Sequence, residues 1–178
     1  MEHSSLNRVA FAATVHCLTG CAIGETLGMI IGTALGWSDW ETIALAVVLA
    51  FFFGYSLTML PLLRGGLTLA AAVPVALAAD TVSIAIMEVV DNAIMLAIPG
   101  AMEAGLDNEL FWGSLSVALV VAGAFAWPAN RWLLARGKGH AAVHATGIHG
   151  GPNPKVVGAI AVIAGTFGTV VLLAELLS

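Results

Sequence analysis

Long apolar stretches separated by short polar connections make up almost the whole chain. A membrane-spanning helix needs about 20 mostly apolar residues. Five stretches meet this length, at residues 9–36, 42–63, 67–99, 109–135 and 156–177. The pattern predicts an all-α, polytopic membrane protein that forms a single transmembrane domain over residues 1–178. A shorter alternative ends the third span near Met87 and places residues 88–108 in an outer interfacial segment.

The composition supports a membrane protein and excludes other classes. The chain is 60% hydrophobic and 10% charged, with a mean hydropathy of +0.98, whereas soluble domains contain about 25% charged residues. A net charge of −5 leaves no basic face for a nucleic-acid backbone. Two cysteines are too few for a disulfide-rich secreted scaffold. The lipid bilayer is therefore the expected environment, and nucleic acid is not an expected partner.

The basic residues indicate how the spans are oriented. With five spans, all six lie on one side of the membrane: Arg8, Arg64, Arg131, Arg136, Lys138 and Lys155. The connections on the other side carry acidic residues and no lysine or arginine. Because basic residues concentrate in cytoplasmic loops, we expect the N-terminus in the cytoplasm and the C-terminus outside.

A ladder of glycines runs along the first span, with each glycine four residues from the last. Its members are Gly20, Gly24, Gly28, Gly32 and Gly36. This spacing leaves one helix face without side chains, so that another helix can approach closely. The pattern predicts helix packing, either against another span or against a second copy of the chain in a homo-oligomer.

Beside the ladder, the first span carries four side chains of the kind that bind metals. Cys17, Cys21 and Glu25 form one row at i, i+4 and i+8, and His16 is adjacent to Cys17. Cβ atoms at i, i+4 are about 5–6 Å apart, whereas a disulfide needs about 3.5–4.5 Å. This spacing favours shared ligation over oxidation. The alternative is that the cysteines are small hydrophobic core residues.

The third span carries a second polar face, formed by Asp80, Ser83, Met87, Glu88 and Asp91. An acid at the centre of a spanning helix costs about 2.5–3.5 kcal/mol on the lenient insertion scale. Within the predicted spans, Arg131 at an inner edge is the sole lysine or arginine. The acids therefore need protonation, water or a bound cation, unless Glu88 and Asp91 are solvated at the outer interface. If the first and third spans face each other, they form one polar column.

The segment 137–154 is a glycine-rich connection that ends in Pro152 and Pro154. It contains His140, His144 and His149. His140 and His144 would share a helix face at i, i+4, and the three could capture a metal on the cytoplasmic side. In so glycine-rich a loop, solvated histidines are the favoured interpretation.

Two strings carry a family resemblance. His-Cys-x-x-Gly-Cys-x-x-Gly-Glu at 16–25 and Met87-Glu88-x-x-Asp91-Asn92 resemble a family of small bacterial integral membrane proteins, domain of unknown function 4396. The resemblance implies a membrane location and a bacterial source, and it assigns no catalytic residue. We therefore expect a multi-pass protein of the bacterial inner membrane.

The ligand types lead to one main hypothesis and two alternatives. Thiolate, thioether and imidazole groups favour Cu(I) or Zn(II), while carboxylates favour harder ions. The leading hypothesis is a copper or zinc transporter or handover protein. Its predicted metal ligands are His16, Cys17, Cys21, Glu25, Asp80, Met87, Glu88 and Asp91.

The first alternative is a proton- or cation-coupled channel or transporter that uses the intramembrane carboxylates, with the cysteines as packing residues. The second is a non-catalytic membrane scaffold or oligomer subunit built on the glycine ladder. An enzymatic function is not expected. A thiol redox enzyme is the least favoured interpretation because of the spacing of Cys17 and Cys21.

Overall fold

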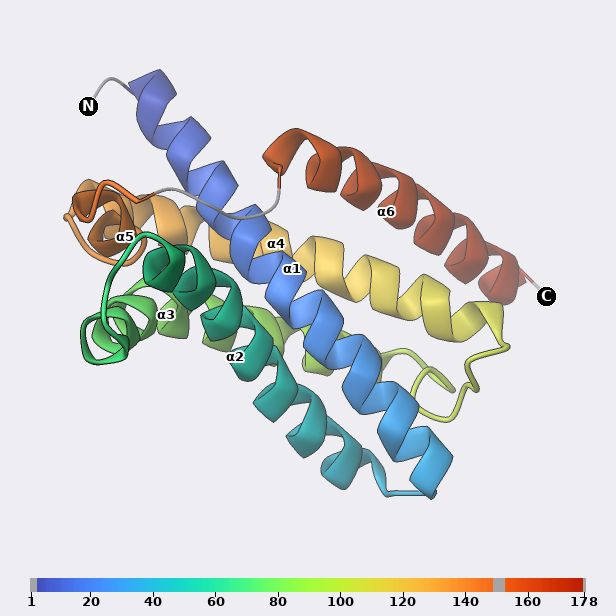
Figure 1. Ribbon diagram of the computed structural model, residues 1–178. Helices are drawn as coiled ribbons and strands as arrows, with labels where there is room; N and C mark the ends of the chain where they lie inside the picture. The colour runs from blue at the N-terminus through green and yellow to red at the C-terminus, as the bar shows by residue number, and fades with distance from the viewer. Residues whose placement is uncertain (1–2, 149–152, 178) are drawn as a thin grey trace.

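The computed structural model describes residues 3–148 and 153–177, and long helices account for most of them (Figure 1). The helices are α1 (His3–Leu35), α2 (Asp39–Arg64), α3 (Leu69–Ala97), α4 (Glu109–Ala135), the short α5 (Ala141–Ala145) and α6 (Pro154–Leu177). Among the described residues, five helices are long and apolar enough to cross a membrane: α1, α2, α3, α4 and α6. The predicted all-α, five-span architecture is confirmed.

The third predicted span contains one continuous helix. Helix α3 runs to Ala97, and both Glu88 and Asp91 are buried within it. The helix therefore does not end near Met87, and the location of residues 88–108 relative to the membrane interface stays a prediction. Pro74 lies inside α3 and Pro128 inside α4, and neither ends its helix.

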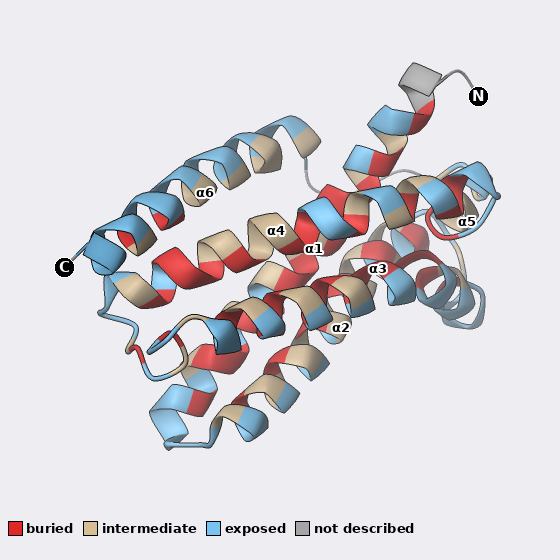
Figure 2. Cartoon of the chain, turned by 180° about the vertical axis from the view of Figure 1, so that it is seen from behind, coloured by how far each residue is buried: buried red, intermediate tan, exposed pale blue. Residues whose placement is uncertain are grey.

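Helices α1 to α4 form a ring in which each contacts the next and α4 returns to α1. Helix α6 lies outside this ring and packs mainly against α4. Figure 2 shows the buried residues gathered on the inward faces of the ring, while α6 is mostly exposed or intermediate. Exposed apolar side chains on the outer faces suit contact with lipid. The buried polar side chains of α1 and α3 are therefore enclosed by α1 to α4.

The glycine ladder of α1 packs against α2 of the same chain. Gly20, Gly24, Gly28 and Gly32 lie against Gly54, Ala50, Ala46 and Thr42, in that order. A Cβ atom at any of the four would overlap α2. The two helices can approach this closely because α1 has no side chains on that face. Since α2 covers this face, an oligomer would have to use another surface. Oligomerisation itself stays a prediction.

Gly36, the last residue of the ladder, has a different role. It follows the end of α1, and a Cβ atom there would meet nothing within 4 Å. Its φ of 65° lies in the left-handed region that favours glycine. Gly36 therefore turns the chain toward α2 and is not a packing residue.

Asn130 on α4 joins three helices through its side-chain amide. Its Nδ2 donates to Thr14 Oγ1 of α1 at 3.0 Å and to Ser83 Oγ of α3 at 2.9 Å. Interhelical hydrogen bonds in membranes contribute about 0.6 kcal/mol each on average. With the cavity left behind, we expect Asn130→Ala to lower the free energy of unfolding by about 2 kcal/mol. Thermal unfolding in detergent tests this, and an unchanged midpoint would contradict it.

Candidate metal site

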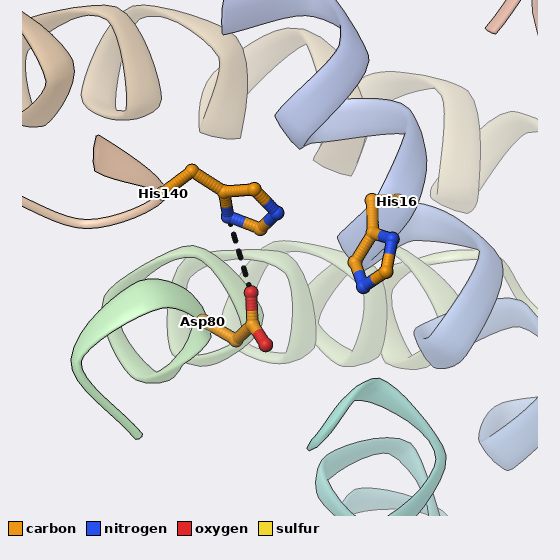
Figure 3. Close-up of side chains that lie close together, drawn as sticks. All are labelled: His16, Asp80 and His140. Carbon is orange, nitrogen blue, oxygen red and sulfur yellow. Dashed lines mark ion pairs between the residues drawn. The ribbon is translucent and has the colours of Figure 1, made fainter. Parts of the chain in front are cut away.

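A buried cluster of three side chains lies where α1, α3 and the segment after α4 meet. His16, Asp80 and His140 each offer a ligand atom, and these atoms lie within 4.8 Å of one another. His140 Nδ1 is 3.2 Å from Asp80 Oδ1, and the two imidazole centroids are 5.2 Å apart. Figure 3 shows the three side chains converging from separate segments. The cluster combines two predicted span residues with one predicted loop residue.

Two glycines place His140 in this cluster. Gly137 and Gly139 have φ angles of 67° and 60°, which turn the chain sharply after α4. Gly139 then lies against Leu133 and the carbonyl oxygen of Ala79. His140 consequently enters the bundle beside α3 and is 9% exposed.

The solvated interpretation is therefore wrong for His140. The predicted capture group of three histidines is also not assembled within the described residues. His144 is on α5 and exposed, although four residues from His140. His149 lies outside the described residues. The i, i+4 spacing of His140 and His144 did not reveal that one is buried and the other exposed. The backbone turn before His140, rather than helical periodicity, decides where its side chain points.

The electrostatics of the cluster suit a bound cation. Burial, and then the neighbouring His16, lower the pKa of His140 to about 3. His140 is therefore a neutral imidazole at neutral pH, the form that binds metals. Both His140 Nδ1 and Asp80 Oδ2 are buried without a hydrogen-bond partner. A cation between these atoms would satisfy them, since buried polar atoms are normally paired.

Neighbouring side chains hold two of the three ligands in place. His16 Nε2 is 2.7 Å from Thr58 Oγ1 of α2, and Cys17 Sγ donates to Asp80 Oδ1 at 3.6 Å. Thr58 was missed by the sequence reasoning. It continues the i, i+4 row of small residues on α2 that includes Ala50 and Gly54, and this row would have placed it beside the first span.

We expect Thr58→Val to weaken metal binding by about 10- to 100-fold, because residues that orient metal ligands have effects of this size. Valine keeps the shape of threonine but cannot bond His16 Nε2. The measurement is Zn(II) affinity by competition with a chromophoric chelator. Thr19→Val is the matched control, since its hydroxyl bonds the carbonyl of Val15 in its own helix. Equal affinities in both variants would contradict the orienting role.

The other predicted ligands form a second group farther along the bundle: Cys21, Glu25, Met87, Glu88 and Asp91. All five are buried, and Cys21 Sγ donates to Met87 Sδ at 3.8 Å. Glu88 is eight residues after Asp80, which is about 12 Å along a helix. One ion therefore cannot contact both groups. Helices α1 and α3 are in contact, as the predicted polar column requires. The polar side chains of the column form two groups, one around Asp80 and one around Glu88.

The comparison with family models identifies the fold family. The model described as "Domain of unknown function (DUF4396)" matches residues 6–139. The chain belongs to this family. The DUF4396 match covers α1 to α4 with His16 and Asp80, and it ends one residue before His140. No curated protein and no solved structure matches the chain. Membership in DUF4396 therefore assigns no chemistry to the site.

Proposed function

We propose that this multi-pass membrane protein binds a transition-metal ion through His16, Asp80 and His140. The observation that carries the proposal is the convergence of their ligand atoms to within 4.8 Å in a buried setting. The three residues are far apart in the sequence and come from two spans and a connecting segment. Packing alone gives no reason to bring two imidazoles and a carboxylate together inside a membrane protein, because buried polar groups cost free energy unless they are paired.

The ligand set favours zinc over copper. Two imidazole nitrogens and a carboxylate oxygen are typical of Zn(II) sites, whereas Cu(I) prefers thiolate and thioether sulfur. Cys17 lies beside the cluster through its contact with Asp80. In a tetrahedral site, Cys17 or water would supply the fourth ligand. A Cu(I) ion would be expected to bind both cysteines. Cys21 contacts Met87 rather than the cluster, which favours zinc.

Charge balance supports the same assignment. A divalent cation beside the Asp80 carboxylate and two neutral imidazoles offsets the cost of a buried negative charge. Among the described residues, α3 carries no lysine or arginine that could do this instead.

The position of the cluster supports a role in transfer. His140 lies outside the spans, in the segment that also carries Arg136 and Lys138, while Asp80 is well inside α3. The ligands thus connect a membrane face with the interior of the bundle. We propose that an ion captured here is passed along the polar column between α1 and α3. Cys21 and Met87 lie next on that route.

Equilibrium dialysis of the purified protein against buffered Zn(II), with metal counted by mass spectrometry, tests the binding proposal. We expect a bound zinc ion that Asp80→Asn loses, because the amide removes the only charged ligand of the cluster. Asp107→Asn, at an exposed acid in the connection before α4, is the control. Zinc retained in full by Asp80→Asn, or no zinc in any variant, would overturn the proposal.

A further inference from the structure

We propose that an anionic phospholipid binds in a groove between α1, α4 and α6, with an acyl chain along the groove and its headgroup at Arg131 and Arg136. The groove consists of two adjoining hollows with volumes of about 450 and 320 Å³. Both hollows are lined by Leu18, Val120, Val157 and Ala161. Lipid binding here does not depend on the zinc cluster, because none of the three zinc ligands lines the groove.

The groove has the length and the wall that an acyl chain requires. On α1 its lining extends from Phe11 to Ile23, which is about 18 Å along a helix. One leaflet of the hydrocarbon core is about 15 Å thick, half of the whole core. The lining is mostly apolar, and its two threonine hydroxyls, of Thr14 and Thr19, donate to carbonyl groups of their own helix. The groove therefore matches a chain from one leaflet.

Small residues keep the groove open. Gly123 and Ala124 line it on α4, and Gly158 and Ala161 line it on α6. Helix α6 packs mainly against α4, and its contact with α1 is much smaller (Figure 1). An opening of this kind on a membrane helix bundle does not stay empty, because a void forfeits the van der Waals contacts of its walls. An acyl chain restores these contacts.

A polar cleft adjoins the groove and supplies charge complementarity. Trp127 lines both the groove and the cleft. The other residues that line the cleft are Asn7, Pro128, Arg131, Trp132, Ala135 and Arg136. None of the described residues that line the cleft or the groove is an aspartate or a glutamate. The cleft therefore has two positive charges beside an apolar groove, which complements a negatively charged headgroup joined to an acyl chain.

Side-chain contacts hold both guanidinium groups at the cleft. Arg131 Nε donates to Asn7 Oδ1 of α1 at 2.7 Å, and Arg136 Cζ lies 4.0 Å from the centre of the Trp132 ring. Guanidinium groups bond phosphate oxygens in a bidentate geometry. Tryptophan is enriched where an apolar region meets a polar one, as Trp127 does here. The lipid phosphate would accordingly lie at the arginines and its chain beyond Trp127.

The same geometry favours a phospholipid over a helix from a partner or from a second copy of the chain. A helix is about 10–12 Å across, and a spanning helix crosses both leaflets. The groove extends over about one leaflet and adjoins a basic cleft at one end. The positive charges favour an anionic lipid over a zwitterionic one.

Native mass spectrometry of the full-length protein, titrated with phosphatidylglycerol or with phosphatidylcholine of the same acyl chains, tests the headgroup assignment. We expect wild type to retain phosphatidylglycerol more strongly, and the double variant Arg131→Gln/Arg136→Gln to weaken its binding by about tenfold or more, since each basic residue contributes about fivefold. Arg64→Gln is the matched control, because Arg64 is an exposed basic residue at the end of α2 and does not line the cleft.

A second pair of variants tests the groove. Ala161→Phe places a ring where the two hollows meet and should weaken the binding of both lipids. Ala159→Phe places the same ring at an exposed position of α6 that lines neither hollow, and it should bind like wild type. Thermal unfolding of each variant shows whether it is folded.

Three results would overturn the lipid site. The first is equal retention of the two lipids by wild type. The second is phosphatidylglycerol binding that is unchanged in the double arginine variant, or that falls equally in Arg64→Gln. The third is a cross-link between two copies of the chain through cysteines placed in the groove, which would show that a second copy occupies it.

Discussion

Replacing His140 with alanine is expected to weaken Zn(II) binding by about 100-fold or more. Loss of a residue that merely orients a ligand costs about 10- to 100-fold, and loss of the ligand itself should cost at least as much. His140 Nδ1 lies 3.2 Å from Asp80 Oδ1, so that its removal takes away one of the two imidazoles next to the carboxylate. The affinity can be measured by competition with a zinc chelator in detergent.

His144→Ala is the matched control for this prediction. His144 lies four residues farther along, on α5, and is exposed where His140 is buried. We expect His144→Ala to bind Zn(II) like wild type. Equal losses in the two variants would indicate that the loop histidines act together, as the spacing alone suggested, and would contradict the buried cluster.

Gly24→Ala is expected to destabilise the protein by about 3 kcal/mol or more. A Cβ atom at this position would overlap the backbone of Ala50, and a helix backbone cannot move aside as a flexible side chain can. Separation of α1 from α2 should also pull His16 away from Thr58 and weaken zinc binding. The free energy of unfolding and the zinc affinity are both measurable on the same preparation.

Gly123→Ala on α4 provides the comparison. Gly123 is also buried in a spanning helix, but a Cβ atom there would meet Leu18 Cδ2 at an ordinary contact distance of 3.4 Å. Alanine is favoured over glycine in a helix by about 1 kcal/mol. We therefore expect Gly123→Ala to be neutral or stabilising. A similar loss of stability in both variants would contradict the claim that the glycine ladder allows close packing of α1 against α2.

Much of the fold could be predicted from the sequence because apolar length alone marks a spanning helix in lipid. The position of Arg64 between two apolar stretches, with acids in the first and third connections, made the division into five spans consistent. Partners of the helices were harder to predict. The face of small residues on α1 predicts close packing against another helix but does not say which one. The partner is α2, which has its own face of small residues around Ala50 and Gly54.

The candidate site was predicted in part. Asp80 stood out because a charged residue deep in a span needs compensation, and His16 because it adjoins Cys17. The role of His140 could not be derived from periodicity. It depends on the left-handed backbone at Gly137 and Gly139, which redirects a polar connection into the bundle. Spacing rules describe residues within one helix, and this site is assembled between helices.

Zinc K-edge X-ray absorption of the zinc-loaded protein tests the central claim most directly. We expect the ligand atoms around zinc to be mainly nitrogen and oxygen, with multiple-scattering features from two imidazoles, one of which is lost in His140→Ala. At most one sulfur, from Cys17, should contribute. A shell dominated by two sulfurs, or one without imidazole scattering, would contradict a metal site built on His16, Asp80 and His140.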